Sequence, residues 1–453
     1  MERTLIENLE EEKESLIKGH INKIRDTKYM IFIVLEDRSG FIQVSIEKEG
    51  NEELTKKLEG VLKDSIMEAK GVMKLSEYVK QGGKEFIPSD INILSYAEAS
   101  PLEEGANLDT RLDYRWIDLK TEKNQLIMKI QSTLVEGMRE YLYSEDFTEI
   151  HTPKLIGTAS ESGSEVFEVS YFDRKAYLAQ SPQFYKQMAI ASGMGRIFEC
   201  GPVFRAEKSH SRKHATEFTG FDLEFSNIDS YEDVMVMEEE MLSYALKKVK
   251  EKYGKKIKEV FNVDVIVPTL PFPRMKLKDI YTELKDKYGY ICPEEEQDDL
   301  TTEGEKLLRV LAKDRYNHEF IFVTDFGPRK RAFYHLRKDG IPQGYDLIWK
   351  GVEITTGAQR EHRYEILKKQ AEKQGLANDV EFYLQFFKYG CPPHGGFGIG
   401  VDRIIMNLLE LASIKESMFI FRGPERLTPW ELSYFIKIHK NDDLVIFARS
   451  FLW

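Results

Sequence analysis

The sequence predicts an α+β protein in which a small β-barrel precedes a larger domain built on a mixed, mainly antiparallel sheet. In residues 16–95, short segments rich in apolar and β-branched residues are separated by turn-forming residues, which is typical of strands. From about residue 126 onward, strand and helix patterns alternate irregularly. A length of 453 residues also exceeds one ordinary domain, so at least two folded units are expected.

The N-terminal region predicts about five strands. The turn at Arg38-Ser39-Gly40 separates two of them, and Gly82-Gly83 lies before the last. A closed barrel of the OB-fold type suits this number and spacing, although any other small antiparallel sheet remains an alternative. The strand segments are HINKI, YMIFIVLED, GFIQVSIEK, IMEAKGVMKLS and FIPSDINILS.

Residues 96–125 show no sustained periodicity and are interpreted as a hinge. Helices are expected over LIMKIQSTLVEGMREYLYSED and over the long amphipathic segment that begins at Tyr231. Strands are expected at FTEIHTPKL, EVFEVSYF, KAYLAQS, RIFECGPVF, HEFIFVTDF, RAFYHLR, GYDLIWKGVEIT and GFGIG. The predicted organisation is a barrel domain at 1–95, a hinge at 96–125, a larger domain at 126–431 and a tail at 432–453.

Composition excludes several classes of protein. A formal net charge of -12 argues against bulk coating of nucleic acid, although a local basic groove can still bind RNA. The three cysteines are far apart and lack CxxC spacing, so neither a disulfide framework nor a zinc site is expected. The charged start MERTLIENLEEEKESL is unlike a targeting peptide, and no apolar stretch of about 18 residues occurs. We expect a cytoplasmic protein without a membrane span.

Two segments carry residues suited to nucleotide chemistry. In GPVFRAEKSHSRKHATEFTGFDLEF, Arg205 and Glu207 precede a basic turn, and such a hairpin can present an arginine to a phosphate and an aromatic ring to a purine. A surface ion pair between Arg205 and Glu207 is the alternative. In GYDLIWKGVEITTGAQREHR, Asp346 and Glu353 supply carboxylates of the kind that hold Mg²⁺ beside phosphates. Ordinary solvated acids are the alternative there.

A third segment, GGFGIGVDRII, leads from a glycine-rich strand into a helix with Arg403 near its start. Glycines permit a close approach of the backbone, and a helix N-terminus attracts anions. The segment matches neither a P-loop nor a Rossmann fingerprint. A purely structural glycine cluster is the alternative for this segment by itself.

In this order, FTEIHTP, FRAE with EFTGFD, and GIGVDR resemble motifs 1, 2 and 3 of class II aminoacyl-tRNA synthetases. The stretches LDTRLDYRWIDL, HTPKL, KAYLAQSPQFYKQ, GAQREHR and YGCPPHGGFGIG resemble the aspartyl-tRNA synthetases of the archaeal and eukaryotic type. The resemblance extends from about residue 16 to about residue 430. It implies an OB-fold anticodon-binding domain followed by a class II catalytic domain.

The resemblance implies an enzyme that activates L-aspartate with ATP and Mg²⁺ and transfers it to tRNA(Asp). It also implies a homodimer with motif 1, around Pro153, at the interface. The implied catalytic residues are Arg205, Glu207 and Arg403. The implied ATP-binding residues are Arg205, Glu207, Lys213, His214, Phe218, Glu353, Gly400 and Arg403. Lys213 is a departure, because the family commonly has arginine there.

Aspartate is expected to be bound by Glu161, Gln183, Lys186, Arg205, Thr356 and Arg360. Lys186 and Arg360 would answer the side-chain carboxylate of the substrate with two positive charges, which disfavours asparagine. Similar asparaginyl enzymes usually lack this lysine and arginine. The implied metal-linked residues are Asp346, Glu353 and Thr356.

The implied anticodon-binding residues are His20, Phe32, Gln43 and Glu85, although Phe32 could instead be a buried barrel residue. His20 replaces the tryptophan of the family pattern GWVHxIRD. In the family, that tryptophan accompanies strict choice of the aspartate anticodon. A non-discriminating enzyme that also charges tRNA(Asn) is therefore the alternative prediction.

Two further alternatives belong to other classes of protein. A catalytically silent tRNA-binding paralogue would be expected to lose Arg205, Glu353 or Arg403, and all three are present. A tRNA-independent asparagine synthetase would lack the anticodon domain that residues 16–95 predict. The chain also departs from the family at Gly423, within FIFRGPERLTP, and in the tail 432–453, to which the sequence assigns no role.

Overall fold

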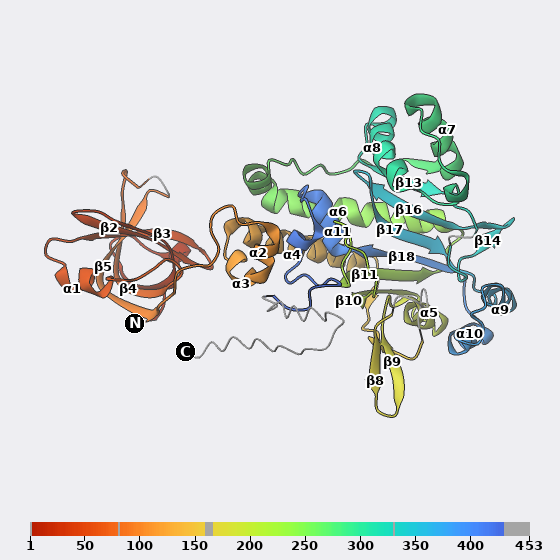
Figure 1. Cartoon of the computed structure of the whole chain (residues 1–453), viewed down its shortest axis with the longest axis horizontal. Helices are drawn as coiled ribbons and strands as arrows, with labels where there is room; N and C mark the ends of the chain where they lie inside the picture. The colour runs from red at the N-terminus through yellow and green to blue at the C-terminus, as the bar shows by residue number, and fades with distance from the viewer. Residues whose placement is uncertain (1, 80–81, 159–165, 329–330, 430–453) are drawn as a thin grey trace, which may run out of the picture. The chain divides into compact units, whose positions relative to one another are not determined.

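The computed structural model describes residues 2–79, 82–158, 166–328 and 331–429, and contacts between residues divide the chain into the units Met1–Ala106 and Asn107–Trp453 (Figure 1). The predicted tail and the predicted aspartate ligand Glu161 lie outside the described residues.

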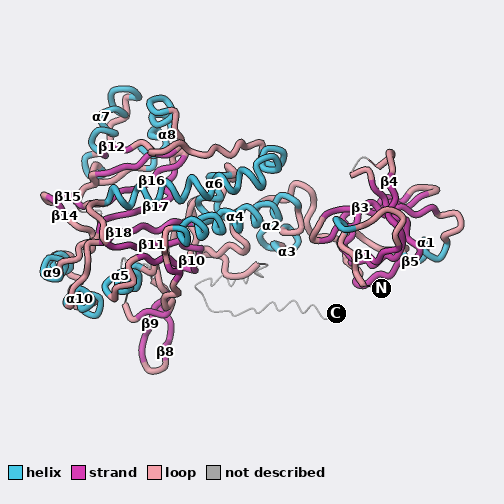
Figure 2. Tube along the Cα trace, turned by 180° about the vertical axis from the view of Figure 1, so that it is seen from behind, coloured by secondary structure: helices cyan, strands magenta, loops and turns pink. Residues whose placement is uncertain are grey.

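The first unit contains a closed five-stranded barrel, as the sequence predicted (Figure 2). In β2 the side chains of Ile31, Ile33 and Leu35 are buried, whereas Phe32 and Val34, which alternate with them, remain half-buried. This period of two places one face of the strand in the barrel core. The strand order is β1-β2-β3-β5-β4, and β3 pairs with β5 in parallel. The bounds are β1 Glu14–Asp26, β2 Met30–Asp37, β3 Gly40–Glu47, α1 Glu52–Lys57, β4 Ile66–Leu75 and β5 Lys84–Ser95, after a short 3₁₀ turn at Ile6–Asn8.

The second unit is organised around an eight-stranded mixed sheet with the order β12-β13-β16-β17-β18-β11-β10-β6. The six central strands are antiparallel, and the two edge strands pair in parallel with their neighbours. This confirms the predicted α+β class. The bounds are β6 Thr148–Glu149, β10 Arg196–Phe204, β11 Glu217–Ser226, β12 Arg274–Lys276, β13 Phe320–Thr324, β16 Gly344–Trp349, β17 Val352–Gln359 and β18 His394–Gly400.

Helices α4 (Glu122–Ser144), α6 (Tyr231–Phe261) and α11 (Val401–Leu408) bury their apolar faces in one core with the sheet (Figure 1). On β11, Phe221 and Leu223 belong to this core. Because successive strand residues point to opposite faces, the neighbouring polar residues of β11 face away from these helices. That second face of the sheet is where polar chemistry can be placed.

The long helix α6 has clear start and stop signals. At its start, Ser230 and Asp233 form a reciprocal capping box, and at its end Asn262 adopts a left-handed conformation with φ 56°. Among the described residues, none of the helices combines the length and apolar character that crossing a membrane requires.

The structure differs from the predicted hinge at 96–125, because the boundary between the two units falls after Ala106. Residues 107–118 form the short helices α2 (Leu108–Asp113) and α3 (Arg115–Asp118). The buried guanidinium of Arg115 donates hydrogen bonds to Asp118 and to the backbone carbonyls of residues 416, 418 and 419. Helices this short show no periodicity, and a distant backbone partner anchors them, so the sequence pattern could not reveal them.

Two predicted strands are also shorter than expected. Of RAFYHLR only the last residue, Arg337, belongs to a strand, and FTEIHTPKL contains only the two-residue strand β6 and the first residue of β7. The remaining elements are β7 Leu155–Ile156, β8 Glu168–Tyr171, β9 Arg174–Leu178, α5 Gln183–Ala191, α7 Leu277–Tyr288, a 3₁₀ turn at Glu294–Glu296, α8 Thr302–Tyr316, β14 Arg337–Lys338, β15 Ile341–Pro342, α9 Tyr364–Lys373, α10 Glu381–Lys388 and α12 Ile414–Ser417.

Candidate active site

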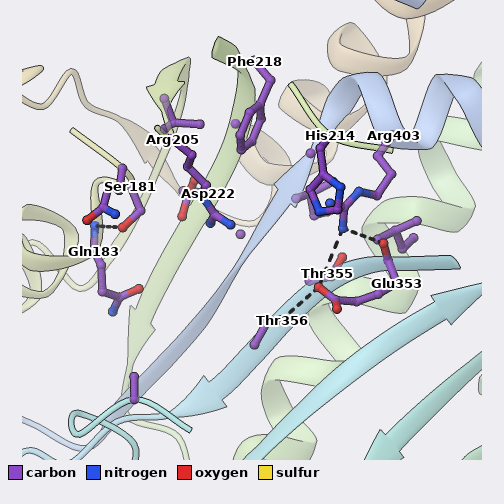
Figure 3. Close-up of a pocket in the computed structure, with 18 of the residues that line it drawn as sticks. Ser181, Gln183, Arg205, His214, Phe218, Asp222, Glu353, Thr355, Thr356 and Arg403 are labelled. Carbon is purple, nitrogen blue, oxygen red and sulfur yellow. Dashed lines mark hydrogen bonds and ion pairs between the residues drawn. The ribbon is translucent and has the colours of Figure 1, made fainter. Parts of the chain in front are cut away.

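A cavity of about 300 Å³ opens on the polar face of the sheet, bounded by α5, the loop between β10 and β11, and the strands β11, β17 and β18. Figure 3 shows its labelled side chains, with Gln183 and Arg205 on one side and Glu353 and Arg403 on the other. Segments far apart in the sequence therefore meet here. The predicted site residues that line the cavity are Gln183, Lys186, Arg205, Glu207, Lys213, His214, Phe218, Glu353, Thr356, Arg360, Gly400 and Arg403.

Three buried charged side chains, Lys186, Asp222 and Arg360, form the floor of the cavity at one end, and the fully buried Glu224 pairs with two of them. Lys186 Nζ lies 3.1 Å from an oxygen of Asp222 and 3.4 Å from an oxygen of Glu224. Arg360 Nε donates a 3.0 Å hydrogen bond to Glu224, and its Nη2 donates to the carbonyl oxygen of Gly396 at 2.8 Å. Two cations therefore face two carboxylates, and Glu224 is held by both cations.

This arrangement corrects one step of the sequence argument. The sequence predicted that Lys186 and Arg360 answer a substrate carboxylate with two positive charges, but in the structure Asp222 and Glu224 already balance those charges. Burial raises the pKa of Asp222, although the charge of Lys186 opposes that shift. Burial also acts to raise the pKa of Glu224, but the charges of Arg360 and Lys186 outweigh it and lower the pKa.

The glycine-rich strand β18 makes room for these two carboxylates. Gly398 pairs with Asp222 and Gly396 pairs with Glu224 across the β11–β18 ladder. A Cβ atom on Gly398 would lie 2.8 Å from Asp222 Oδ1, and one on Gly396 would lie 2.1 Å from the Leu223 carbonyl oxygen. Both distances are shorter than van der Waals contact. The glycines therefore have a structural role in the strand. The site also needs them, because a side chain at either position would clash with its neighbours.

The loop after β10 lines the opposite end of the cavity. Arg205 Nη1 lies 3.6 Å from Glu207, so the ion pair considered as an alternative does occur, but within the cavity lining. The Arg205 guanidinium also lies 5.7 Å from the centre of the Phe218 ring. His214 lies 3.7 Å from Glu207, and burial lowers the pKa of His214, which keeps its imidazole neutral at neutral pH. A cation, a carboxylate and an aromatic face are thus grouped here.

Arg403 and Glu353 meet on the other side of the cavity. Arg403 Nη1 donates to the Glu353 backbone carbonyl at 2.9 Å and lies 3.8 Å from its carboxylate. Thr356 Oγ1 donates to the same carboxylate at 3.4 Å. The Glu353 side chain is 37 % exposed, so its oxygens remain accessible from the cavity. A carboxylate and a hydroxyl next to an arginine are suited to a metal ion bound with phosphates.

Asp346 differs from its predicted role as a direct metal ligand. Both of its carboxylate oxygens accept hydrogen bonds from Arg331, at 2.9 and 2.6 Å, and the residue is buried. It lies directly opposite Thr356 on the neighbouring strand, and so beside Thr356 on the same face of the sheet, but it is not among the residues that line the cavity. The sequence could not predict this pairing, because Arg331 belongs to a segment that was interpreted as a plain strand.

Sequence reasoning missed several residues that line the cavity, among them Asp222, Arg331 and His335. For Asp222 a signal was available. Phe218 was already assigned to the site, and counting in steps of two along the strand places Asp222 and Glu224 on the same face. Arg331 and His335 carried no comparable signal.

Comparison with known proteins identifies the family. Residues 107–421 match the model of class II tRNA synthetases (D, K and N), and residues 16–94 match the OB-fold nucleic acid binding domain. The chain belongs to the class II aminoacyl-tRNA synthetases. It is 39% identical to an aspartate–tRNA(Asp/Asn) ligase of Aeropyrum pernix, over 92% of this chain and 97% of that protein.

Other relatives of this synthetase agree in class but differ in the amino acid named. It is 37% identical to an aspartate–tRNA(Asp) ligase of Pyrococcus furiosus, over 91% of this chain and 95% of that protein. A crystal structure of asparaginyl-tRNA synthetase from Pyrococcus horikoshii with asparaginyl-adenylate has a TM-score of 0.86 at 29% identity, covering 95% and 100% of the two chains. The predicted family, the two-part fold and the enzyme class, an aminoacyl-tRNA ligase, are confirmed.

In the first unit of the synthetase, the predicted anticodon residues lie on the outer surface of the barrel. Phe32 is half-buried on the outward face of β2, which contradicts the alternative of a core residue. Gln43 pairs with Val34 on one side and with Glu85 on the other, so it joins β2 to β5. His20 is exposed and pairs with Glu36, four residues farther along β2 than Phe32. That these residues bind RNA remains a prediction.

The buried carboxyl group of Glu238 on α6 predicts how the stability of the protein changes with pH. Burial raises the pKa of Glu238 to about 8, although Tyr345 donates a 2.8 Å hydrogen bond to its carboxyl group. Between the ordinary pKa and pH 8 the folded state keeps a proton that the unfolded state releases, so stability falls as pH rises. Changing Glu238→Gln should flatten this dependence between pH 5 and 8 by on the order of 1 kcal/mol per pH unit.

Urea unfolding of the second unit at several pH values would measure this difference. Glu240→Gln is the matched control, because Glu240 lies on the same helix and accepts a hydrogen bond from Tyr141 at an exposed position. Equal pH slopes for wild type and Glu238→Gln would contradict the assignment of a buried protonated carboxyl group.

Proposed function

We propose that this synthetase activates L-aspartate with ATP to form aspartyl-adenylate and transfers the aspartyl group to tRNA(Asp). The observation that carries the proposal is the buried pair of cations, Lys186 and Arg360, fixed by two carboxylates at the floor of a cavity. The same cavity is also lined by Arg205, Phe218 and Arg403. The cavity can therefore accommodate an amino acid and a nucleotide next to each other.

Selection of aspartate follows from hydrogen-bond polarity rather than from excess charge. The ammonium of Lys186 and the guanidinium of Arg360 are donor-only groups. Both oxygens of an aspartate carboxylate can accept from them, whereas the amide nitrogen of asparagine would point a donor at a donor. A site built from such polar groups discriminates strongly, because the wrong substrate leaves buried groups unpaired. Gln183, whose buried Nε2 has no hydrogen-bond partner in the described chain, is a further donor for the substrate.

The nucleotide is proposed to lie along the other residues of the cavity. Phe218 would stack on the adenine ring, while Glu207 would accept a hydrogen bond from its amino group. Arg205 would hold the α-phosphate and the substrate α-carboxylate, and Arg403 would face the distal phosphates together with Lys213 and His214. The aspartate α-carboxylate attacks the α-phosphorus in line, the bond from that phosphorus to the bridging oxygen breaks, and pyrophosphate leaves while the arginines stabilise the developing charge. No protein nucleophile is required, because positioning and electrostatics carry the rate enhancement.

The donor set at Glu353 and Thr356 fits Mg²⁺, which is commonly held by one or two carboxylates together with substrate phosphates. When bound, the ion would neutralise charge on the ATP phosphates. Asp346 would support the site from beside Thr356, and it would have to release Arg331 to contact the ion directly. In the described residues, no cluster of three or more carboxylate, histidine or cysteine side chains forms a self-sufficient metal site.

The barrel supplies the proposed tRNA-reading surface. Phe32 would stack on an anticodon base, and Gln43 and Glu85 would form hydrogen bonds with base edges, as OB-folds do with single-stranded RNA. We expect the enzyme to act in the cytoplasm, where charged tRNA supplies translation. The relative from Aeropyrum pernix is named for both tRNA(Asp) and tRNA(Asn). Together with His20, this keeps the non-discriminating enzyme as the second candidate.

The proposed activity is tested by aspartate-dependent ATP–pyrophosphate exchange. Wild type should catalyse it, which a silent paralogue would not. Lys186→Met should lower kcat/KM for aspartate by about a hundredfold, equivalent to roughly 2.7 kcal/mol of transition-state binding. The control Lys256→Met removes an exposed lysine that pairs with Glu122 and should change nothing. Unchanged exchange in Lys186→Met would show that the amino-acid pocket is assigned wrongly.

The metal assignment predicts that Glu353→Gln lowers exchange at limiting Mg²⁺ by about a hundredfold, because one ligand oxygen is replaced by a poorer one. Higher Mg²⁺ should recover part of the activity, and binding of tRNA in a filter assay should stay close to that of wild type. Glu410→Gln, which removes an exposed partner of Lys350, serves as the control. The same Mg²⁺ dependence in wild type and Glu353→Gln would rule out this ligand.

We further propose a two-fold homodimer in which residues 147–153 lie against their copy, since an isologous contact of this kind is self-complementary. Sedimentation velocity at micromolar concentration should give one species with twice the 52.8 kDa mass of the chain. A fully active monomer would overturn the dimer.

The tRNA specificity is tested by charging purified tRNA(Asp) and tRNA(Asn) transcripts with aspartate side by side. We expect a preference for tRNA(Asp), and His20→Trp should increase it by adding a packing contact near the anticodon. Single base contacts contribute about 1–3 kcal/mol, so the expected change is about tenfold. Comparable charging of both transcripts by wild type would instead establish the non-discriminating enzyme.

A further inference from the structure

Glu305, a residue outside every motif of the sequence analysis, contacts the loop that borders the cavity. Its carboxylate oxygens lie 2.9 and 3.3 Å from Nζ of Lys213, which is 92 positions away in the sequence. The two side chains are only 9 % and 23 % exposed. This pair is therefore shielded from solvent, and its attraction is stronger than that of an exposed ion pair.

The position of Glu305 is set by helix α8 and not by the loop. Glu305 lies in the first turn of α8. The Thr301 side chain caps this helix by accepting a 2.9 Å hydrogen bond from the amide of Gly304. The turn between β16 and β17 packs directly against this part of α8. A Cβ on Gly351 would lie 3.0 Å from the Glu305 carbonyl oxygen. The carboxylate thus projects from a fixed scaffold.

The loop at 205–216 is held at two further points. The carbonyl of Arg212 accepts a 2.9 Å hydrogen bond from the amide of Ile414, and the amide of Thr216 donates to the carbonyl of Arg422 at 3.1 Å. Lys213 and Ile414 both line the cavity. The side-chain contact with Glu305 therefore completes a set of anchors at the rim.

Glu305 also belongs electrostatically to the phosphate end of the cavity. Burial raises its pKa, with a further contribution from the negative charge of Glu353, while the charges of Lys213 and Arg403 oppose the shift. The ammonium of Lys213 carries three donors, so it can keep Glu305 and still donate to a phosphate oxygen. Glu305 can thus hold Lys213 and still leave an N–H donor of the lysine available for a phosphate oxygen.

We propose that Glu305 is a positioning residue for ATP: it holds Lys213, and with it the loop 205–216, at the cavity rim before the nucleotide arrives. The energetic gain is pre-organisation, because a loop already in place loses less conformational freedom on binding. The inference rests on the proposed use of ATP in this cavity. It also explains how lysine can serve where the family commonly has arginine, since a fixed carboxylate supplies the orientation that the lysine lacks.

The first test uses the nucleotide-free protein and does not depend on activity. The loop contains trypsin sites at Arg205, Lys208, Arg212 and Lys213. Glu305→Gln should raise the rate of cleavage within the loop about tenfold, as expected when about 1.4 kcal/mol of anchoring is lost. Glu303→Gln is the matched control, because it lies on the same turn of α8 and removes only an exposed pair with Lys306. Equal cleavage rates in wild type and Glu305→Gln would overturn the proposal.

The second test separates positioning from simple stabilisation. In pyrophosphate exchange, Glu305→Gln and Lys213→Met should each raise KM for ATP about tenfold with kcat within about twofold, and the double variant should be no worse than either. Lys213→Arg should keep KM for ATP near the wild-type value. Additive effects on KM, or a fall in kcat with an unchanged KM, would overturn the proposal. Absence of exchange in wild type would instead refute the proposed function and leave the proteolysis result intact.

Discussion

The site depends on burying two carboxylates, Asp222 and Glu224, beneath the cavity without leaving either unpaired. Removing an ion from water costs several kcal/mol, and only close, well-oriented partners repay that cost. Lys186 and Arg360 are those partners, at 3.1 and 3.0 Å. Their presence constrains the neighbouring strand as well, because the carboxylates occupy the space that side chains at Gly396 and Gly398 would need.

This constraint connects segments that the sequence shows as unrelated. The lysine comes from α5, the carboxylates from β11, the arginine from the end of β17 and the glycines from β18. The antiparallel register between β11 and β18 places each glycine opposite one carboxylate. A shift by one residue would turn both carboxylates toward the apolar helices α4 and α6. The register of the strands, the pairing of the buried charges and the shape of the cavity therefore depend on one another.

The sequence predicted much of this because its signals are local. Alternation located the barrel strands, and the motif segments located Arg205, Glu353 and Arg403 at one cavity. The features that the sequence did not predict depend instead on contacts between distant segments. The pairing of Asp346 with Arg331, the anchoring of α3 through Arg115 and the contact of Glu305 with Lys213 all join residues whose meeting is decided by tertiary structure. No spacing rule encodes such contacts, and the glycines of β18 became interpretable only with their neighbours in place.

A balanced set of charges also explains how the floor of the cavity can exist before substrate binds. Two uncompensated cations would repel each other and would lower each other's affinity for a proton. Asp222 and Glu224 balance the charges of Lys186 and Arg360 and hold their donor groups in place. Under the proposed function, selectivity for aspartate comes from the fixed direction of these donors, since reorienting them would break contacts that keep the carboxylates paired. Stability of the floor and discrimination at its surface thus have the same physical origin.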